Sequence, residues 1–264
     1  MAINPYSTII YSGGVHRLNF FLQKGPERMR SDPILAAASF VNSHFPRCEA
    51  ALLAGSVVRG ETTSTSDLDL FIYMPSLHKE YRESFYEEGW MVEAFVHTSS
   101  SYKKYFSSDC DRGRPSLPKM VAEGVIIKNS PSIPKIKEEA QTLLAQGPKL
   151  WDSQTIEIKR YMLTDVLLDF IGAKSREEEI FIAGSLSELL HEFILRINGQ
   201  WSGSSKWIYK ALRNFDRELA SRFFAAFEEY YRTGKKSGII SLTDKSLEPY
   251  GGRLFAGFSL GKNG

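Results

Sequence analysis

Two aspartates in one predicted strand are the residues of this chain best suited to chemistry. Asp67 and Asp69 lie in the segment 66–73, whose apolar residues are typical of a buried strand. Because side chains of a strand alternate between its faces, both carboxylates point the same way, about 7 Å apart. Leu68 and Leu70 point the opposite way, into a core. Hard divalent cations prefer oxygen ligands such as carboxylates, so the pair predicts a metal site.

A glycine-serine turn lies upstream of this strand. Gly55 and Ser56 follow the apolar, strand-like segment 50–53 and begin a short predicted helix. A glycine lets the backbone approach a ligand closely, and the amides that open a helix bind phosphate oxygens. A phosphate-binding turn beside metal-binding carboxylates is the equipment of phosphoryl or nucleotidyl transfer.

The segment 50–97 resembles the DNA polymerase β-type nucleotidyltransferase superfamily. The signature of that superfamily is a Gly-Ser turn, a downstream Asp-x-Asp flanked by apolar residues, and a third carboxylate on a later strand. Gly55, Ser56, Asp67 and Asp69 match this signature as they stand. The order of these elements between two apolar strands makes the match specific, whereas an isolated Asp-x-Asp would not be.

Two further residues extend the resemblance. Arg59, three residues after the serine, matches an arginine often found in the same helical turn. Glu93, in the strand-like segment 90–97, is the best candidate for the third carboxylate, although many members of the superfamily have aspartate there. The alternative is that Glu93 is only a strand residue, in which case Asp109 or Asp111 is the next candidate.

The resemblance implies a mechanism with two divalent ions, Mg²⁺ or alternatively Mn²⁺, and an NTP as co-substrate. The implied metal ligands and catalytic residues are Asp67, Asp69 and Glu93, with Glu93 also the candidate general base. The implied residues for the NTP phosphates are Gly55, Ser56 and Arg59.

The composition is that of a globular protein with a substantial core. Of 264 residues, 42% are hydrophobic and 12% aromatic, yet no apolar run reaches the length of about 18 residues that a spanning helix needs. The N-terminus lacks the pattern of a secretory signal, and Cys48 and Cys110 are too few for a disulfide framework, so a cytoplasmic location is expected. The net charge of +2 is spread evenly, which argues against a long nucleic-acid partner and gives no sign of membrane contact.

The pattern of apolar residues divides the chain near residue 130. Residues 1–130 form the predicted catalytic domain, and 131–264 a helical substrate-binding domain with an irregular, glycine-rich tail; residues 1–30 suggest no clear element. In the first domain we expect a helix from Pro33 to about His44, strands near 50–53, 67–73, 90–97 and 125–127, and a helix over Ser76–Glu88. In the second we expect helices over about 135–146, 154–172, 176–198, 205–213 and 216–233. The expected fold class is therefore α+β, a short mixed sheet with flanking helices followed by a helical bundle.

The helical half resembles the substrate domain of small-molecule nucleotidyltransferases, such as those that modify aminoglycoside or lincosamide antibiotics. In such domains a lysine approaches the active site, and Lys206 is the candidate here for a contact with the NTP phosphates; a solvated surface position is the alternative. Trp201 and Trp207, on either side of the polar segment 202–206, could stack on a base or sugar. The simpler interpretation, that both tryptophans are core residues, is favoured.

Two pairs of acidic residues, each one helical turn apart, leave alternatives open. Asp165 and Asp169 lie in an otherwise apolar helix, where they could bind cationic amines of an acceptor or pair with Lys159 or Arg160. Glu188 and Glu192 could face the cleft, but a solvated helix face is favoured for them.

These observations lead to one functional prediction with two alternatives. We expect metal-dependent transfer of a nucleoside monophosphate from an NTP to a hydroxyl of a small-molecule acceptor, with release of pyrophosphate. The alternatives are nucleotidylation of a protein or RNA, and a non-catalytic, antitoxin-like protein that binds nucleotides. The intact turn and all three carboxylates argue against the last. The acceptor, the preferred NTP and the oligomeric state do not follow from the sequence.

Overall fold

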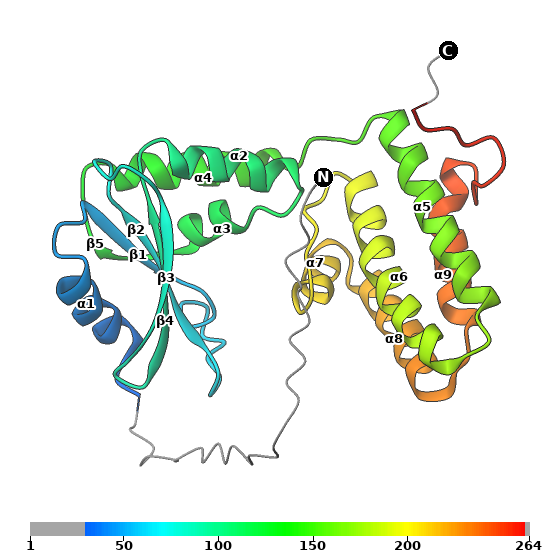
Figure 1. Ribbon diagram of the computed structural model, residues 1–264, viewed down its shortest axis with the longest axis horizontal. Helices are drawn as coiled ribbons and strands as arrows, with labels where there is room; N and C mark the ends of the chain where they lie inside the picture. The colour runs from blue at the N-terminus through cyan, green and yellow to red at the C-terminus, as the bar shows by residue number, and fades with distance from the viewer. Residues whose placement is uncertain (1–29, 262–264) are drawn as a thin grey trace, which may run out of the picture.

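The computed structural model describes residues 30–261, and its elements divide into a sheet-bearing half and a helical half (Figure 1). The sheet-bearing half contains, in chain order, α1 Pro33–His44, β1 Ala50–Ala54, β2 Asp67–Tyr73, β3 Tyr81–Glu87, β4 Trp90–His97, α2 Ser101–Asp111, α3 Ser116–Glu123, β5 Val125–Lys128 and α4 Ile133–Gln146. The helical half contains α5 Ser153–Gly172, α6 Arg176–Ile197, α7 Trp207–Phe215, α8 Arg217–Thr233, α9 Ser237–Leu247 and the 3₁₀ helix η1 Glu248–Tyr250. The predicted α+β fold class is confirmed.

The five strands form one mixed sheet in the order β3-β4-β2-β1-β5. β2 runs parallel to β4, and every other neighbouring pair in this sheet is antiparallel. The strands expected near 50–53, 67–73, 90–97 and 125–127 are β1, β2, β4 and β5, so these predictions are confirmed. The parallel pairing matters for the site because it sets Asp69 directly opposite Glu93.

The two faces of the sheet are covered by different helices. On one face α1 packs against Leu68, Leu70 and Ile72 of β2, each of them fully buried. On the other face, α2, α3 and α4 pack against the sheet, with Phe71 of β2 in the same cluster. Since strand side chains alternate, Asp67 and Asp69 share the second face with Phe71. The predicted orientation of the two aspartates relative to the core is therefore confirmed.

The predicted helix over Ser76–Glu88 is wrong, because most of this segment is the edge strand β3. β3 pairs with β4 through a two-residue turn in which Glu88 and Gly89 both have positive φ, 50° and 81°. Such a turn matches the twist of two antiparallel strands. The outer edge of β3 has no strand neighbour among the described residues, and most of its side chains are exposed. With its many charged residues, the sequence of β3 therefore resembles that of a solvent-exposed helix.

The helices of the second half are close to those predicted. The five expected helices correspond to α4, α5, α6, α7 and α8, whereas α2 and α3 in the first half and α9 in the second were not predicted. Ile133, Ile136 and Ala140 of α4 belong to the apolar cluster that covers the sheet. The division of the chain into two domains near residue 130 stays a prediction. Helix α4 comes after residue 130 in sequence but packs on the sheet of the first half.

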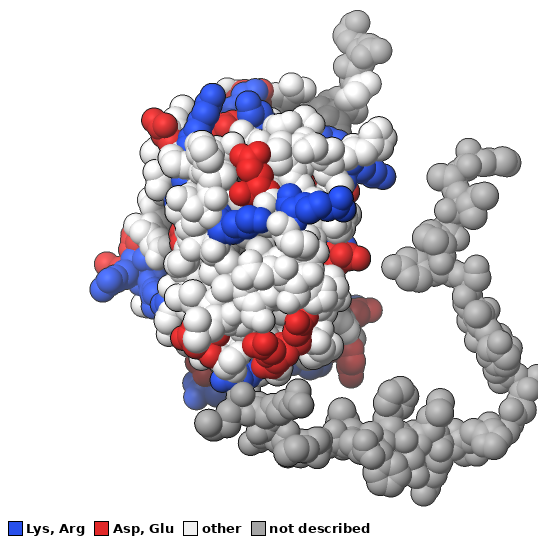
Figure 2. Space-filling view, turned by 90° about the vertical axis from the view of Figure 1, so that its left-hand side faces the viewer, with Lys and Arg blue, Asp and Glu red and all other residues white. Residues whose placement is uncertain are grey.

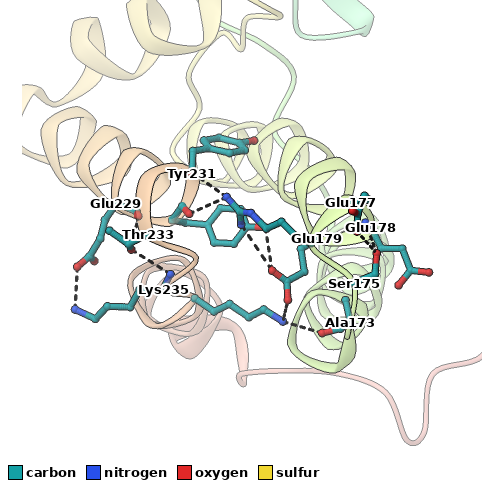
Figure 3. Close-up of polar contacts among 12 residues, drawn as sticks. Ala173, Ser175, Glu177, Glu178, Glu179, Glu229, Tyr231, Thr233 and Lys235 are labelled. Atoms are coloured by element: carbon teal, nitrogen blue, oxygen red, sulfur yellow. Dashed lines mark hydrogen bonds and ion pairs between the residues drawn. The ribbon is translucent and has the colours of Figure 1, made fainter.

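Polar contacts fasten one end of the helical bundle, where the α5–α6 and α8–α9 turns meet (Figure 3). The Lys236 ammonium lies 2.8 Å from Glu179 Oε1 and donates to the carbonyl of Ala173 at 3.1 Å. Arg176 donates to the carbonyl of Tyr231 at 2.8 Å. These contacts join the start of α6 to the end of α8 and fix the bundle on which α7 rests.

The face of the molecule drawn in Figure 2 is not strongly charged, because its acidic and basic side chains are interspersed with uncharged residues. None of the described helices is both long and apolar enough to cross a bilayer. Any concentration of charge that bears on function must therefore lie elsewhere than on this face.

His97, the last residue of β4, is a buried imidazole. It is 5% exposed, its ring stacks on Phe71 with centroids 5.5 Å apart, and Nδ1 lies 3.2 Å from Ser101 Oγ. Burial lowers the pKa of His97 to about 4, although the charges of Glu80 and Asp109 act in the opposite direction. The folded protein therefore holds this ring neutral at a pH where the unfolded chain would protonate it.

This difference predicts a loss of stability in acid. The contribution of neutral His97 to the free energy of unfolding is complete above pH 6.5, which is about the pKa of a histidine in the unfolded chain. It is lost as the pH falls towards 4, because only the unfolded chain takes up the proton in that window. We expect a loss of about 2–3 kcal/mol from this group between about pH 7.5 and pH 4.5, measured by urea unfolding. His97→Gln should show a smaller loss than the wild type, and the exposed His78→Gln the same loss. Equal losses in all three proteins would contradict the prediction.

Candidate active site

Three carboxylates meet at one end of the central strands. Each of Asp67, Asp69 and Glu93 offers a ligand oxygen, and these oxygens lie within 4.8 Å of one another. The strands explain the grouping, since Asp67 and Asp69 share a face of β2 and the parallel register puts Glu93 of β4 beside Asp69. The structure thus brings together the three residues predicted to hold metal, and their roles as ligands stay a prediction.

Gly55 sits directly over this group. It directly follows β1, whose last residue, Ala54, pairs with Asp69. Its φ of +86° favours glycine, and a Cβ at this position would lie 2.4 Å from Asp69 Oδ2. A side chain here would therefore strain the turn and displace the carboxylate, which gives a physical reason for the glycine of the predicted phosphate turn.

The three carboxylates repel one another when all of them are charged. Burial, and after it the negative charges of Asp67 and Glu93, raise the pKa of Asp69 to about 6, against a weaker lowering by Arg82 and Arg59. Arg82 of β3 donates to Glu93 Oε1 at 2.5 Å and is the direct cationic partner of the group. One arginine beside three half-buried carboxylates leaves an excess of negative charge that divalent cations would compensate, so the donor set fits such ions.

The turn and the loop before β2 are tied to each other by hydroxyl groups. Ser56 Oγ donates to Ser66 Oγ at 2.9 Å, and the same Ser66 oxygen accepts from the Thr63 amide at 2.9 Å. Ser66 directly precedes Asp67, so the predicted phosphate ligand and the first carboxylate are held by one small network.

Arg30 organises this loop from outside. Its guanidinium donates to the carbonyls of Thr63, Ser64 and Ser66, at 3.1, 2.7 and 3.2 Å, and it lies 4.4 Å over the ring of Trp90. A planar guanidinium can serve several carbonyls at once, which an ammonium cannot do in the same geometry. Sequence analysis did not single out Arg30, because nothing in its neighbourhood signals a contact more than thirty residues away.

We expect Arg30→Ala to lower turnover by about 10–100-fold, because misplacement of reacting groups by about 1 Å can cost this much. Arg30→Lys should recover only part of the loss. Steady-state pyrophosphate release and thermal melting should be measured on both variants, with Arg47→Ala as the control because Arg47 is an exposed arginine of the same domain. Wild-type turnover in Arg30→Ala would show that the loop holds its shape without the arginine.

Arg59 lies in a cluster of cations around one indole. Its guanidinium carbon lies 5.0 Å from the centroid of Trp207, and the ammonium groups of Lys119 and Lys210 lie 5.0 and 4.8 Å from it. Glu61 contacts both Arg59, at 3.3 Å, and Lys210, at 2.6 Å. The cluster joins the two halves of the chain, since Arg59 and Lys119 come from the sheet-bearing half and Lys210 and Trp207 from α7.

A cavity of about 550 Å³ joins the carboxylates to this cluster. Its walls come from both halves, with Gly55, Ser56, Asp67 and Asp69 on one side and the α6–α7 loop and α7 on the other. Trp201 and Trp207 both line it, so the favoured prediction that they are core residues is wrong. Such a volume is within the range of sites that hold a nucleotide-sized ligand.

The other predicted positions divide between this cavity and other parts of the molecule. Lys206 lines the cavity at the start of α7. Asp165 and Asp169 lie exposed on α5 and are not part of the described cavity wall, so the alternative that they bind amines of an acceptor has no support from this cavity. The suggested pairing of these aspartates with Lys159 or Arg160 is also wrong, since Lys159 pairs with Glu192 and Arg160 donates to the carbonyl of Gly252.

Asp109, the alternative candidate for the third carboxylate, and Glu188 both have structural contacts. Asp109 is buried, accepts from the Leu117 amide at 2.8 Å and pairs with Arg112, so it caps the start of α3 rather than joining the carboxylate group. Glu188 lies near Arg114, at 3.6 Å, and accepts from the Ser205 amide at 3.4 Å. Glu188 is not among the residues that line the described cavity.

Sequence analysis missed four cations of the site, Arg82, Arg114, Lys119 and Lys210. Arg82 was assigned to a helix, and a strand assignment would have placed it across from the strand of Glu93. Lys119 and Lys210 belong to helices whose relation to the turn is set only by the packing of the two halves, so no local signal identifies them.

Comparison with known proteins agrees with the geometry. Residues 37–109 match the family model described as a nucleotidyltransferase domain. No curated protein matches the chain. A solved structure, the nucleotidyltransferase-like protein from Exiguobacterium sibiricum 255-15, is 11% identical over 82% of this chain and 74% of that chain, with a TM-score of 0.44. A likeness this remote carries no argument about function, and the matched domain, which spans the carboxylates and the turn, is the informative finding.

Proposed function

We propose that this chain, a nucleotidyltransferase by the domain at residues 37–109, transfers a nucleoside monophosphate from an NTP to a hydroxyl group of a small-molecule acceptor. The observation that carries the proposal is the group of three carboxylates, of which Asp69 lies against Gly55 and Asp67 and Asp69 line a cavity of about 550 Å³. The 33 lysines and arginines of the chain are nearly balanced by 31 aspartates and glutamates, which favours a small acceptor over a polynucleotide.

Asp67, Asp69 and Glu93 would hold the divalent ions, Mg²⁺ or Mn²⁺. When bound, such ions neutralise charge on the phosphates and lower the pKa of the attacking hydroxyl. The fit rests on the donor set, three carboxylates whose oxygens lie within 4.8 Å of one another; burial first and the neighbouring carboxylates second raise the pKa of Asp69.

The remaining residues of the site would position the NTP and neutralise the charge of its phosphates. The amides at Gly55 and Ser56 and the Ser56 hydroxyl would bind the outer phosphates, with Arg59 and Lys206 as cations beside them. In the reaction, the acceptor oxygen forms a bond to the α-phosphorus, and the bond from that phosphorus to the oxygen bridging the α- and β-phosphates breaks. The hydroxyl proton passes to Glu93, and pyrophosphate leaves with the electron pair. Positioning and charge neutralisation account for most of the catalysis expected from such a site.

Pyrophosphate release tests this proposal directly. The purified chain should be incubated with each of the four NTPs, Mg²⁺ or Mn²⁺, and a panel of hydroxyl-bearing compounds, with EDTA as the control. We expect release that requires the metal and increases with at least one compound. Release that is unaffected by EDTA, or NTP binding without any turnover across the panel, would favour the non-catalytic alternative.

A further inference from the structure

The charged residues of the cavity are mostly basic. The basic residues that line it are Arg59, Arg114, Lys119, Lys206 and Lys210, and the acidic residues that line it are Asp67, Asp69 and Glu123. An NTP accompanied by two divalent ions brings little net charge. The charge that the acceptor meets is therefore mainly that of the residues lining the cavity. A cleft lined by one sign of charge attracts ligands of the other sign.

Each acidic residue of the described cavity wall already has partners. Asp67 and Asp69 belong to the group that fits metal. Glu123 lies 3.2 Å from Arg59 and 3.7 Å from Lys119. Within residues 30–261 this leaves no carboxylate in the wall to pair with an ammonium group of an acceptor. A cationic acceptor would lose hydration without gaining an ion pair, which is costly in a partly enclosed site.

Four of these five basic residues fall into two groups. Arg59, Lys119 and Lys210 gather around Trp207, beside the turn proposed to bind the phosphates. Arg114 lies on the α2–α3 loop, away from that cluster in sequence, and lines the cavity together with Ser202 of the α6–α7 loop.

The place of Arg114 is fixed by the backbone. The preceding residue, Gly113, has a φ of +71°, and its carbonyl accepts from the Ser202 amide at 2.9 Å and from Ser202 Oγ at 3.1 Å. The Arg114 amide donates to the carbonyl of Asp109 at 3.0 Å. Among residues 30–261 the guanidinium has one recorded side-chain partner, Glu188 at 3.6 Å, so its donors are available to a ligand at modest cost.

We propose that the acceptor carries an anionic group, a phosphate or a carboxylate, that Arg114 binds, and that polyamine compounds such as aminoglycosides are not acceptors. This inference rests on the proposed function and names its substrate class. A guanidinium presents a fork of donors that matches both anions in bidentate geometry. Gln200, Ser202 and Ser204, which line the same cavity, supply neutral donors and acceptors for the hydroxyl groups of such a compound.

The test compares acceptors that share a skeleton and differ in charge: glucose 6-phosphate and gluconate, glucose, glucosamine, and an aminoglycoside as the polycation. We expect pyrophosphate release, above that with water alone, to be at least about tenfold faster with an anionic compound than with the amines, the effect of one charge-assisted contact. Calorimetry with a non-hydrolysable NTP analogue and Mg²⁺ should show binding of an anionic compound and none of the aminoglycoside. The two anionic compounds distinguish phosphate from carboxylate.

Variants identify the residue. Arg114→Gln should raise the KM for the anionic compound about tenfold and leave the KM for the NTP unchanged. Lys104→Gln, an exposed position on α2, is the control and should change neither value. Faster release or tighter binding with the amines, or an unchanged preference in Arg114→Gln, would overturn the inference. Absence of metal-dependent release with every compound and with water would instead reject the proposed function.

Discussion

Asp69→Asn is expected to reduce pyrophosphate release by about a thousandfold or more, because the lost charge serves to hold cations that neutralise the phosphates. Asp69 is central to the carboxylate group, since it lies opposite Glu93 and under Gly55. Asp67→Asn should have a similar effect on turnover. Manganese binding, followed by calorimetry, should weaken in both variants.

The same substitution should stabilise the protein in the absence of metal. Burial and two neighbouring carboxylates oppose the charge of Asp69, as its raised pKa shows, and asparagine removes that charge while keeping the shape. We expect a gain of about 1–2 kcal/mol in the free energy of unfolding in EDTA. Asp165→Asn, at an exposed site on α5, is the matched control. A destabilised Asp69→Asn protein with wild-type turnover would reject the metal-binding role.

Glu93→Gln is expected to separate binding from chemistry. Loss of a general base costs about 10²–10⁴-fold in rate, and impaired metal binding adds to this. NTP affinity should be nearly retained, because Gly55, Ser56 and Arg59 are unchanged. The two measurements are calorimetric NTP affinity and steady-state turnover on the same protein.

A matched control distinguishes this role from the neighbouring ion pair. Glu83→Gln removes an exposed carboxylate from β3, the strand that also supplies Arg82. It should leave turnover unchanged, whereas Glu93→Gln should lower it at least a hundredfold. Turnover of Glu93→Gln within a few-fold of wild type would show that the third carboxylate is not needed for the reaction.

Much of the site can be predicted from sequence because local rules fix it. The alternation of β2 places Asp67 and Asp69 on one face, and the left-handed turn explains Gly55. Glu93 could be proposed only through a family resemblance, since its position beside Asp69 depends on a parallel pairing that no local pattern specifies. The roles of these residues remain to be tested by the variants above.

The errors have physical causes as well. β3 is an edge strand whose exposed side chains lack the apolar alternation of a half-buried strand, so its sequence resembles a surface helix. Trp201 and Trp207 were assigned to the core because large aromatics usually are buried, and here they line a cavity between two halves. Lys119 and Lys210 meet at Trp207 only after those halves pack.

The construction of the cavity from separate segments has an evolutionary consequence. The carboxylates belong to β2 and β4 and the Gly-Ser turn directly follows β1, whereas the wall that would face the acceptor comes from the α2–α3 and α6–α7 loops. Loops tolerate replacement better than the strands of a central sheet. A lineage of such chains can therefore diversify its acceptors by exchanging a few residues around Arg114 and Ser202 while inheriting the reaction unchanged.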